Sequence, residues 1–252
     1  MLKYSRLKNE IMILFVLSLL PIRTFSQELL MLTDDGPPHM IAKSNNGIDV
    51  DITREILQEL GYKVKIEFAP LKRSMRQVIE KKADLFLPSF FQEDTKELFL
   101  STPFIHYRPT AFSLKNSNFI FKRIADLTGK QLTTFQGATG YFGEEFVKIS
   151  KLEGYRELHD MSKLPEMLIK KRCEVVVLDY YIFHYFLKEY LKANPNENFT
   201  IQEIEEFRLF PEVNAHVVFH DKKLRNKFNE QLKRYKDKDK HHIVISKYIG
   251  VK

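Results

Sequence analysis

The sequence contains a single cysteine, Cys173, among 252 residues. A lone cysteine cannot form an intramolecular disulfide, so a disulfide-stapled scaffold is excluded. Cys173 lies between a helical pattern and an apolar strand pattern, which favours a buried and unreactive thiol.

Long hydrophobic runs are also missing. The longest apolar run, Ile11–Leu20, is about half of the ~20 residues that a membrane span needs. Lys3, Arg6 and Lys8 precede it, and the small residues of Thr24-Phe25-Ser26 follow it. This order predicts a secretory signal peptide cleaved near Ser26, with a retained anchor as the less favoured alternative. A lipid anchor is not expected, because no cysteine lies at the cleavage site.

The chain has little clustered positive charge. The formal charge is +7, of which the leader contributes +3, so the exported chain carries +4. Only Lys233–Lys240 is dense in lysine, and Asp237 and Asp239 interrupt it. A nucleic-acid surface needs a clustered basic face, so we expect a solvated helix end and no nucleic-acid partner.

Motifs for catalysis, cofactors and metals are absent as well. The sequence has no G-x-S-x-G, P-loop or dinucleotide fingerprint. His241 and His242 are adjacent, so on a regular element their side chains should diverge, and no cysteine or carboxylate cluster has metal-ligand spacing. We therefore expect no cofactor and no metal. Tyr180, Tyr181 and Tyr185 fit packing on a helix better than a cofactor site.

What remains is an alternation of short apolar strands and amphipathic helices, which predicts an α/β fold with mostly parallel sheets. Two such series lie on either side of about residue 112. The strands are expected at Glu28–Leu32, Lys63–Phe68, Leu85–Phe91, Gln131–Phe135, Glu174–Leu178 and Ala215–Phe219. The helices are expected at Asp49–Leu60, Leu71–Lys82, Glu144–Ile149, Lys163–Arg172 (with Ser162 as its cap), Tyr181–Leu191 and a long segment capped by Asp221.

Six short motifs occur in a fixed order along the chain. They are Gly36-Pro37-Pro38-His39-Met40, Gly47-Ile48-Asp49-Val50-Asp51-Ile52, Lys82-Ala83-Asp84-Leu85, Leu100-Ser101-Thr102-Pro103-Phe104, Asp126-Leu127-Thr128-Gly129-Lys130 and Val175–Asp179. In this order and spacing the chain resembles the family 3 bacterial periplasmic solute-binding proteins, which bind amino acids and similar small polar solutes.

The resemblance implies a type II periplasmic-binding-protein fold of two lobes. Each lobe would be a mixed, mostly parallel sheet flanked by helices, and two hinge strands would join them. Residues 1–26 would be the signal peptide, 27–111 and 217–252 lobe 1, and 112–216 lobe 2. It further implies a periplasmic monomer that closes on its solute and passes it to the permease of an ABC transporter, or presents it to a sensor receptor.

One departure from the family's motifs concerns the residue that holds the ligand carboxylate. Typical amino-acid binders of the family carry T-P-E-R before the F-S-x-P motif, and that arginine holds the ligand carboxylate. This chain has Phe91-Gln92-Glu93-Asp94-Thr95-Lys96 there, without an arginine. A lysine does not replace a bidentate guanidinium. Lys96, Arg73 or Arg108 are the candidates for a substitute cation.

Candidate ligand-binding residues in lobe 1 follow its predicted strands, at the edge where α/β sheets bind ligands. Asp35 and His39 flank the Gly-Pro-Pro turn, although turn chemistry alone would also account for them. Arg73 begins a helix after Pro70, with a plain surface arginine as the alternative. Ser89 offers a polar contact at a strand end, and Phe90 an aromatic wall or a core side chain.

Candidate residues in lobe 2 lie in two places. Thr139, Gly140 and Tyr141 form a glycine loop before a helix, where backbone amides can bind an anion. Asp179 ends a buried strand, where an unpaired carboxylate is costly. The resemblance implies that Asp179 receives the ligand ammonium, whereas the residues alone also allow a helix cap.

Two alternatives to a transport protein stay open. The family resemblance includes periplasmic dehydratases, and an enzyme on this fold would need a general acid or base such as His39, Glu93 or Asp179. A sensory binding protein would instead present its closed form to a receptor.

Overall fold

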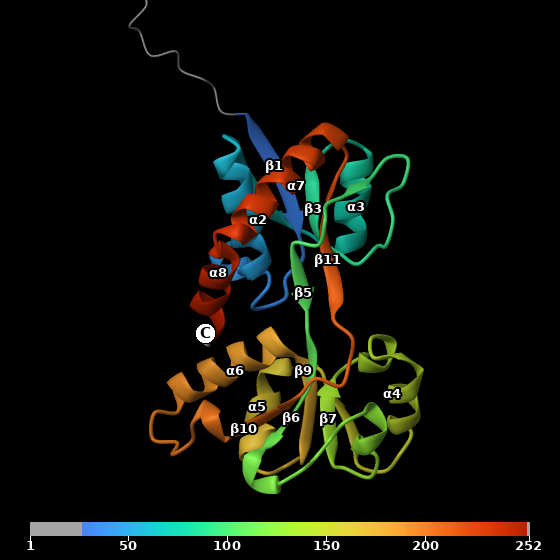
Figure 1. The fold of residues 1–252 in the computed structure, drawn as a ribbon, viewed down its shortest axis with the longest axis vertical. Coiled ribbons are helices and arrows are strands. Elements are labelled where there is room, and N and C mark those ends of the chain that lie inside the picture. Colours follow the sequence, from blue (N-terminus) through green and yellow to red (C-terminus); the bar gives the residue numbers. More distant parts are fainter. Residues whose placement is uncertain (1–26, 251–252) are drawn as a thin grey trace, which may run out of the picture.

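The computed structural model describes residues 27–250 and places them in two sheets, each covered by helices on both faces (Figure 1). The predicted signal peptide lies outside the described residues. We call the six-stranded sheet with its helices lobe 1 and the five-stranded sheet with its helices lobe 2. The α/β, two-lobed expectation is confirmed. No helix among residues 27–250 combines the length and apolarity required to cross a bilayer.

Lobe 1 is built on three parallel strands, to which β11 pairs antiparallel. The strand order is β2-β1-β3-β11-β4, and β5 also pairs with β11. Its strands are β1 (Glu28–Thr33), β2 (Lys63–Phe68), β3 (Leu85–Ser89), β4 (Phe99–Leu100), β5 (Ile105–Tyr107) and β11 (Val213–Phe219). Its helices are α2 (Ile48–Glu59), α3 (Leu71–Ile79), α7 (Lys222–Asp237) and α8 (Lys240–Ile249).

Lobe 2 has the strand order β10-β6-β9-β7-β8, with β7, β8 and β9 parallel and β6 antiparallel to both neighbours. Its strands are β6 (Pro109–Leu114), β7 (Leu132–Phe135), β8 (Tyr155–Leu158), β9 (Val175–Asp179) and β10 (Ile204–Phe207). Its helices are α4 (Gly143–Ile149), α5 (Leu164–Ile169) and α6 (Tyr180–Ala193). Short 3₁₀ turns are η1 (Ala42–Ser44), η2 (Lys115–Ser117), η3 (Ile124–Leu127), η4 (Ala138–Gly140), η5 (Met161–Lys163) and η6 (Ile201–Glu203).

The burial of the central strands agrees with helices on both faces of each sheet. Every residue of β3 and of β9 is buried, as expected for strands enclosed between helical layers. In lobe 1, α2, α7 and α8 pack on one face of the sheet, whereas residues of α3 pack on the other. Cys173 is buried as predicted, and burial raises the pKa of its thiol to about 11.

Three details of the predicted helices are wrong. Ser162 does not cap the helix that follows it, because it lies inside η5, where the Asp160 carboxylate accepts hydrogen bonds from its amide and hydroxyl. The helix itself is shorter than expected and begins at Leu164 with Pro165 in its first turn. α3 likewise ends at Ile79, three residues before the predicted end.

The chain passes between the lobes twice (Figure 1). Arg108 connects β5 to β6, and residues 208–212 connect β10 to β11. A third link comes from α8, whose C-terminal end reaches α6 of lobe 2. There the Lys188 ammonium donates to the backbone carbonyls of Lys247 and Tyr248, at 3.1 Å each. A cation at a helix C-terminus is favourable because the last carbonyls carry partial negative charge.

Gly47 fixes the path of the loop between β1 and α2. Its φ is +139°, and a Cβ at this position would lie 2.8 Å from the Met40 Cα and closer still to the His39 carbonyl. We expect Gly47→Ala to lower the free energy of unfolding by about 3 kcal/mol or more, because backbone strain adds to a backbone clash.

Gly61 provides the matched control. Its φ is +86°, but a Cβ there meets nothing within 4 Å. Gly61→Ala should therefore cost only the conformational penalty of about 1–2 kcal/mol. Urea unfolding of the two variants measures both values, and equal losses would contradict a close backbone approach at Gly47.

Candidate functional site

The loop between β1 and α2 carries His39 to the junction of the lobes. The first amides of α2 hold this loop, since Ile48 donates to the Pro38 carbonyl at 2.9 Å and Asp49 to the His39 carbonyl at 3.0 Å. An antiparallel bridge between Gly36 and Met40 closes the turn. As a result the His39 side chain is held in the interior, with 1% of the residue exposed.

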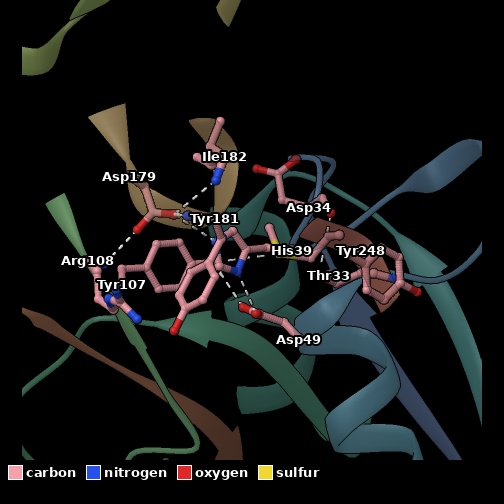
Figure 2. A network of polar contacts seen from close by, with 12 residues as sticks. Thr33, Asp34, His39, Asp49, Tyr107, Arg108, Asp179, Tyr181, Ile182 and Tyr248 are labelled. Atoms are coloured by element: carbon pink, nitrogen blue, oxygen red, sulfur yellow. Dashed lines mark hydrogen bonds and ion pairs between the residues drawn. The ribbon is translucent and has the colours of Figure 1, made fainter. Parts of the chain in front are cut away.

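His39 joins a carboxylate of lobe 1 to a carboxylate of lobe 2 (Figure 2). Its Nδ1 lies 2.7 Å from Asp49 Oδ1, and its Nε2 lies 3.4 Å from Asp179 Oδ1. The imidazole stacks on the Tyr107 ring, with 3.9 Å between centroids, and meets the edge of Tyr181 at 5.6 Å. One buried imidazole therefore has contacts with both lobes.

Asp49 is the inner partner of this network and is fully buried. Its Oδ2 accepts a hydrogen bond of 2.9 Å from the Tyr107 hydroxyl, while Oδ1 faces His39. Both oxygens are thus satisfied by side chains, which is what a buried carboxylate requires. Burial, followed by the Asp49 charge, raises the pKa of Tyr107 well above its usual value, so the phenol stays protonated.

Asp179 is the outer partner, and its side chain is 10% exposed. It caps α6, because Oδ1 accepts from the amides of Tyr181 at 2.9 Å and Ile182 at 3.2 Å. Oδ2 accepts from the Arg108 amide at 2.6 Å. The helix-cap alternative is therefore confirmed for Asp179.

The charge state of His39 follows from these contacts. Burial alone would lower the pKa of His39, but the carboxylates of Asp49 and Asp179 outweigh it and raise the pKa to about 9. At neutral pH the group is an imidazolium cation between two carboxylates. A general acid or base must reach a substrate, and the burial of His39 leaves it poorly placed for that role.

Arg108 supplies a second cation at the lobe junction. Its guanidinium carbon lies 3.9 Å from the centre of the Tyr180 ring and 5.6 Å from that of Tyr181, in cation–π geometry. Its Nε is buried without a hydrogen-bond partner among the described residues. Of the three proposed substitute cations, Arg108 alone lies beside the His39 network.

The other two cations lie elsewhere. Arg73 is exposed on α3 and lines a surface depression of about 590 Å³ with Arg76, Gln77, Glu80 and Lys82. Lys96 lies in the exposed loop after β3. Asp35 is exposed too, and its carboxylate accepts a hydrogen bond of 2.9 Å from the Ala42 amide.

The end of β3 provides one polar residue and two aromatic residues. Ser89 is 2% exposed, and its hydroxyl accepts from the Phe91 amide at 3.3 Å. Phe90 meets the Tyr107 ring edge-on at 5.2 Å and so adjoins the His39 network. Phe91 leaves 44% of its surface exposed.

The loop after β7 offers side chains more than backbone amides. Gly140 and Tyr141 use their amides within the turn, donating to Gly137 and Ala138 at 3.0 and 2.9 Å. Thr139 is half-buried, and Tyr141 is 69% exposed. The Thr139 and Tyr141 side chains are both accessible at this loop.

Among residues 27–250, one group outside this junction has metal-ligating chemistry. Asp239, His241 and His242 place one ligand atom each within 4.8 Å of one another at the start of α8. The expectation that His241 and His242 diverge is wrong, since their ring centroids lie 4.1 Å apart. The first turn after the left-handed Asp239 brings the two rings together.

Asp49 and Tyr107 were missed as members of the site. Two acidic residues in the first turn of a helix fit the helix dipole, so Asp49 carried no separate signal. Tyr107 belongs to a three-residue strand without a recognisable pattern. Only the tertiary contact with His39 reveals both.

The sequence pattern that defines the bacterial extracellular solute-binding proteins, family 3, matches residues 29–251. Comparison with curated protein sequences gives no match.

Three solved structures illustrate the shared fold. An ancestral cationic amino acid solute-binding protein superposes with a TM-score of 0.68 at 18% identity, covering 88% of this chain and 95% of its own. The arginine-, lysine-, histidine-binding protein ArtJ from Geobacillus stearothermophilus superposes with a TM-score of 0.56 at 16% identity. The match covers 90% of this chain and 96% of ArtJ. A histidine kinase sensor domain similar to periplasmic binding proteins superposes with a TM-score of 0.59 at 15% identity. The match covers 91% of this chain and 99% of the sensor domain.

Proposed function

Since the chain belongs to the family 3 bacterial extracellular solute-binding proteins, we propose that it binds a small polar solute, an amino acid or a derivative, between its two lobes. The observation that carries the proposal is the meeting of His39 from lobe 1 with Asp179 from lobe 2. Polar groups from both lobes converge there, as a site that closes by hinge motion requires. The solved neighbours named for cationic amino acids and for arginine, lysine and histidine support this solute class.

The residues proposed to contact the solute come from both lobes. Phe91 and Tyr141 leave large aromatic surfaces exposed, one in each lobe. Together with Phe90 they can enclose the apolar part of a solute, while Asp35 and Thr139 offer polar contacts. Ser89, Gly140 and Arg73 complete the proposed set.

We propose that the protein acts after export to the periplasm and as a monomer. Delivery of the solute to the permease of an ABC transporter is the first candidate role. Presentation of the closed form to a sensor receptor is the second, and the sensor-domain neighbour favours it. Permease and ATPase genes beside the gene would support transport, whereas a neighbouring sensor gene would support signalling.

An enzyme on the same fold is less well supported. The family and the two amino-acid-binding neighbours are binding proteins. The strongest acid–base candidate, His39, is held between two carboxylates and is 1% exposed.

A thermal-shift screen of residues 27–252 tests the proposal. Amino acids, polyamines and small carboxylates would each be added, and every hit would be analysed for products. A solute at 100 times its Kd should add about 2.7 kcal/mol of stability, which is a clear shift in the unfolding temperature.

Recovery of a hit unchanged supports a binding protein. Conversion of a hit to product would overturn the proposal in favour of an enzyme. A screen without any stabilising solute would contradict the amino-acid class. Phe91→Ala and Tyr141→Ala should weaken binding of a hit, whereas Ile120→Ala, also at an exposed apolar residue, should not.

A further inference from the structure

We propose that protonated His39 is an internal cationic ligand of Asp179, which joins the lobes and keeps an ammonium group of the solute away from that carboxylate. The inference rests on the proposed function for its second part, the choice of solute. Its first part, the bridge itself, concerns the protein without any solute.

The geometry of the imidazole favours a cation. Nδ1 and Nε2 each face a carboxylate oxygen, at 2.7 Å on Asp49 and 3.4 Å on Asp179. A neutral imidazole has one donor nitrogen, so it could serve only one of these acceptors. The shorter contact would keep that proton on the side of Asp49, and the contact between the lobes would be lost.

Every element around the imidazole agrees with this charge. Asp49 comes from α2 and Asp179 from β9, while β5 and α6 contribute the phenol rings of Tyr107 and Tyr181. Burial raises the pKa of Tyr181 to about 12, so this phenol is neutral. The Arg108 guanidinium lies over the rings of Tyr180 and Tyr181. Among residues 27–250, the two carboxylates are the only charged groups that contact the imidazole.

The bridge leaves little of Asp179 for a solute. Three donors surround Oδ1, namely the His39 imidazole and two amides of α6, and the Arg108 amide occupies Oδ2. The His39 imidazolium, shared with Asp49, and the positive end of α6 both stabilise the carboxylate charge. An ammonium group brought to the remaining exposed surface would lie close to the imidazolium, and like charges at short distance repel.

This arrangement selects among solutes of one class. Two solutes that differ only in the α-amino group should bind with similar affinity, because the amino group has no unpaired carboxylate at Asp179. A solute that is charged through its carboxylate groups should lose no affinity because of the bridge between His39 and Asp179. His39 is thus a specificity-determining residue that acts through Asp179.

A histidine titration followed by NMR tests the bridge without any solute. We expect His39 in the wild-type protein to titrate near pH 9 and Asp179→Asn to lower that value clearly. Asp160→Asn is the matched control, because Asp160 also caps a turn in lobe 2 but contacts Ser162 instead of His39. An unchanged His39 titration in Asp179→Asn would overturn the proposal.

Two pairs of probes test the choice of solute: L-glutamate with glutarate, and L-arginine with 5-guanidinopentanoate. Isothermal titration should give wild-type Kd values within about tenfold in whichever pair binds. Asp179→Asn should leave that ratio unchanged. His39→Gln should favour the amino acid by a further tenfold or more, since it leaves the Asp179 carboxylate without a cationic partner.

The outcomes separate the two proposals. A tenfold loss of amino-acid preference in Asp179→Asn would show that Asp179 holds the ammonium, and would overturn the inference while supporting solute binding. Failure of both pairs, with a normal His39 titration, would count against the amino-acid class and support the bridge. If His39→Gln does not fold, the measurements on the wild-type protein and on Asp179→Asn still test the bridge and the choice of solute.

Discussion

Asp49→Asn should lower the free energy of unfolding by about 3 kcal/mol or more at pH 7. The change removes the nearest counter-charge of a buried imidazolium and the acceptor charge that faces the Tyr107 hydroxyl. Breaking a buried pair by removing one partner typically costs about 3–5 kcal/mol, because the other charge is left uncompensated. Urea unfolding followed by far-ultraviolet circular dichroism measures the loss.

Two further variants show whether the loss comes from the charge. Asp35→Asn alters an exposed carboxylate of the same loop and should change stability by less than about 0.5 kcal/mol. Adding His39→Phe to Asp49→Asn should restore part of the loss, since an apolar replacement removes the uncompensated charge. A loss below about 1 kcal/mol for Asp49→Asn alone would contradict a charged network at this position.

Stability should also decline as the pH rises from neutrality toward 9 and above. The pKa of His39 is about 9 in the folded protein, against 6.5 ordinarily. The folded state therefore binds the proton more tightly, and its stabilisation is complete below pH 6.5 and lost as the pH rises through about 9. The difference in pKa corresponds to roughly 3 kcal/mol.

The comparison with His39→Gln isolates this contribution from other titrating groups. Unfolding in urea at intervals between pH 6 and 9.5 should show the wild-type protein losing its advantage over the variant as the pH rises. A difference in the free energy of unfolding between the two proteins that stays constant over this pH range would contradict a raised pKa of His39.

Much of the fold followed from periodicity in the sequence. β2 occupies the predicted residues Lys63–Phe68, and α7 begins after its predicted cap, Asp221, whose carboxylate accepts from the Lys223 and Leu224 amides. The two-residue strand β4 and the three-residue strand β5 were not predicted, since they are too short to show alternation. They form only because β11 pairs with both.

The site was predictable in part. His39 and Asp179 were expected from their positions after predicted strands and from family resemblance, and the structure brings them together across 140 positions of sequence. Their pairing with each other could not be predicted, because it depends on how the lobes are placed. Whether Asp35, Arg73, Ser89, Phe90, Thr139, Gly140 and Tyr141 bind the solute remains a prediction.

The crystal structure of residues 27–252 with the most stabilising solute from the screen is the most direct test of the central claim. We predict electron density for the solute between the end of β3 and the loop after β7, in contact with at least one residue of each lobe. His39 should still lie between Asp49 and Asp179 in that complex. Solute density confined to one lobe, or on the outer face of α3 beside Arg73, would contradict the account.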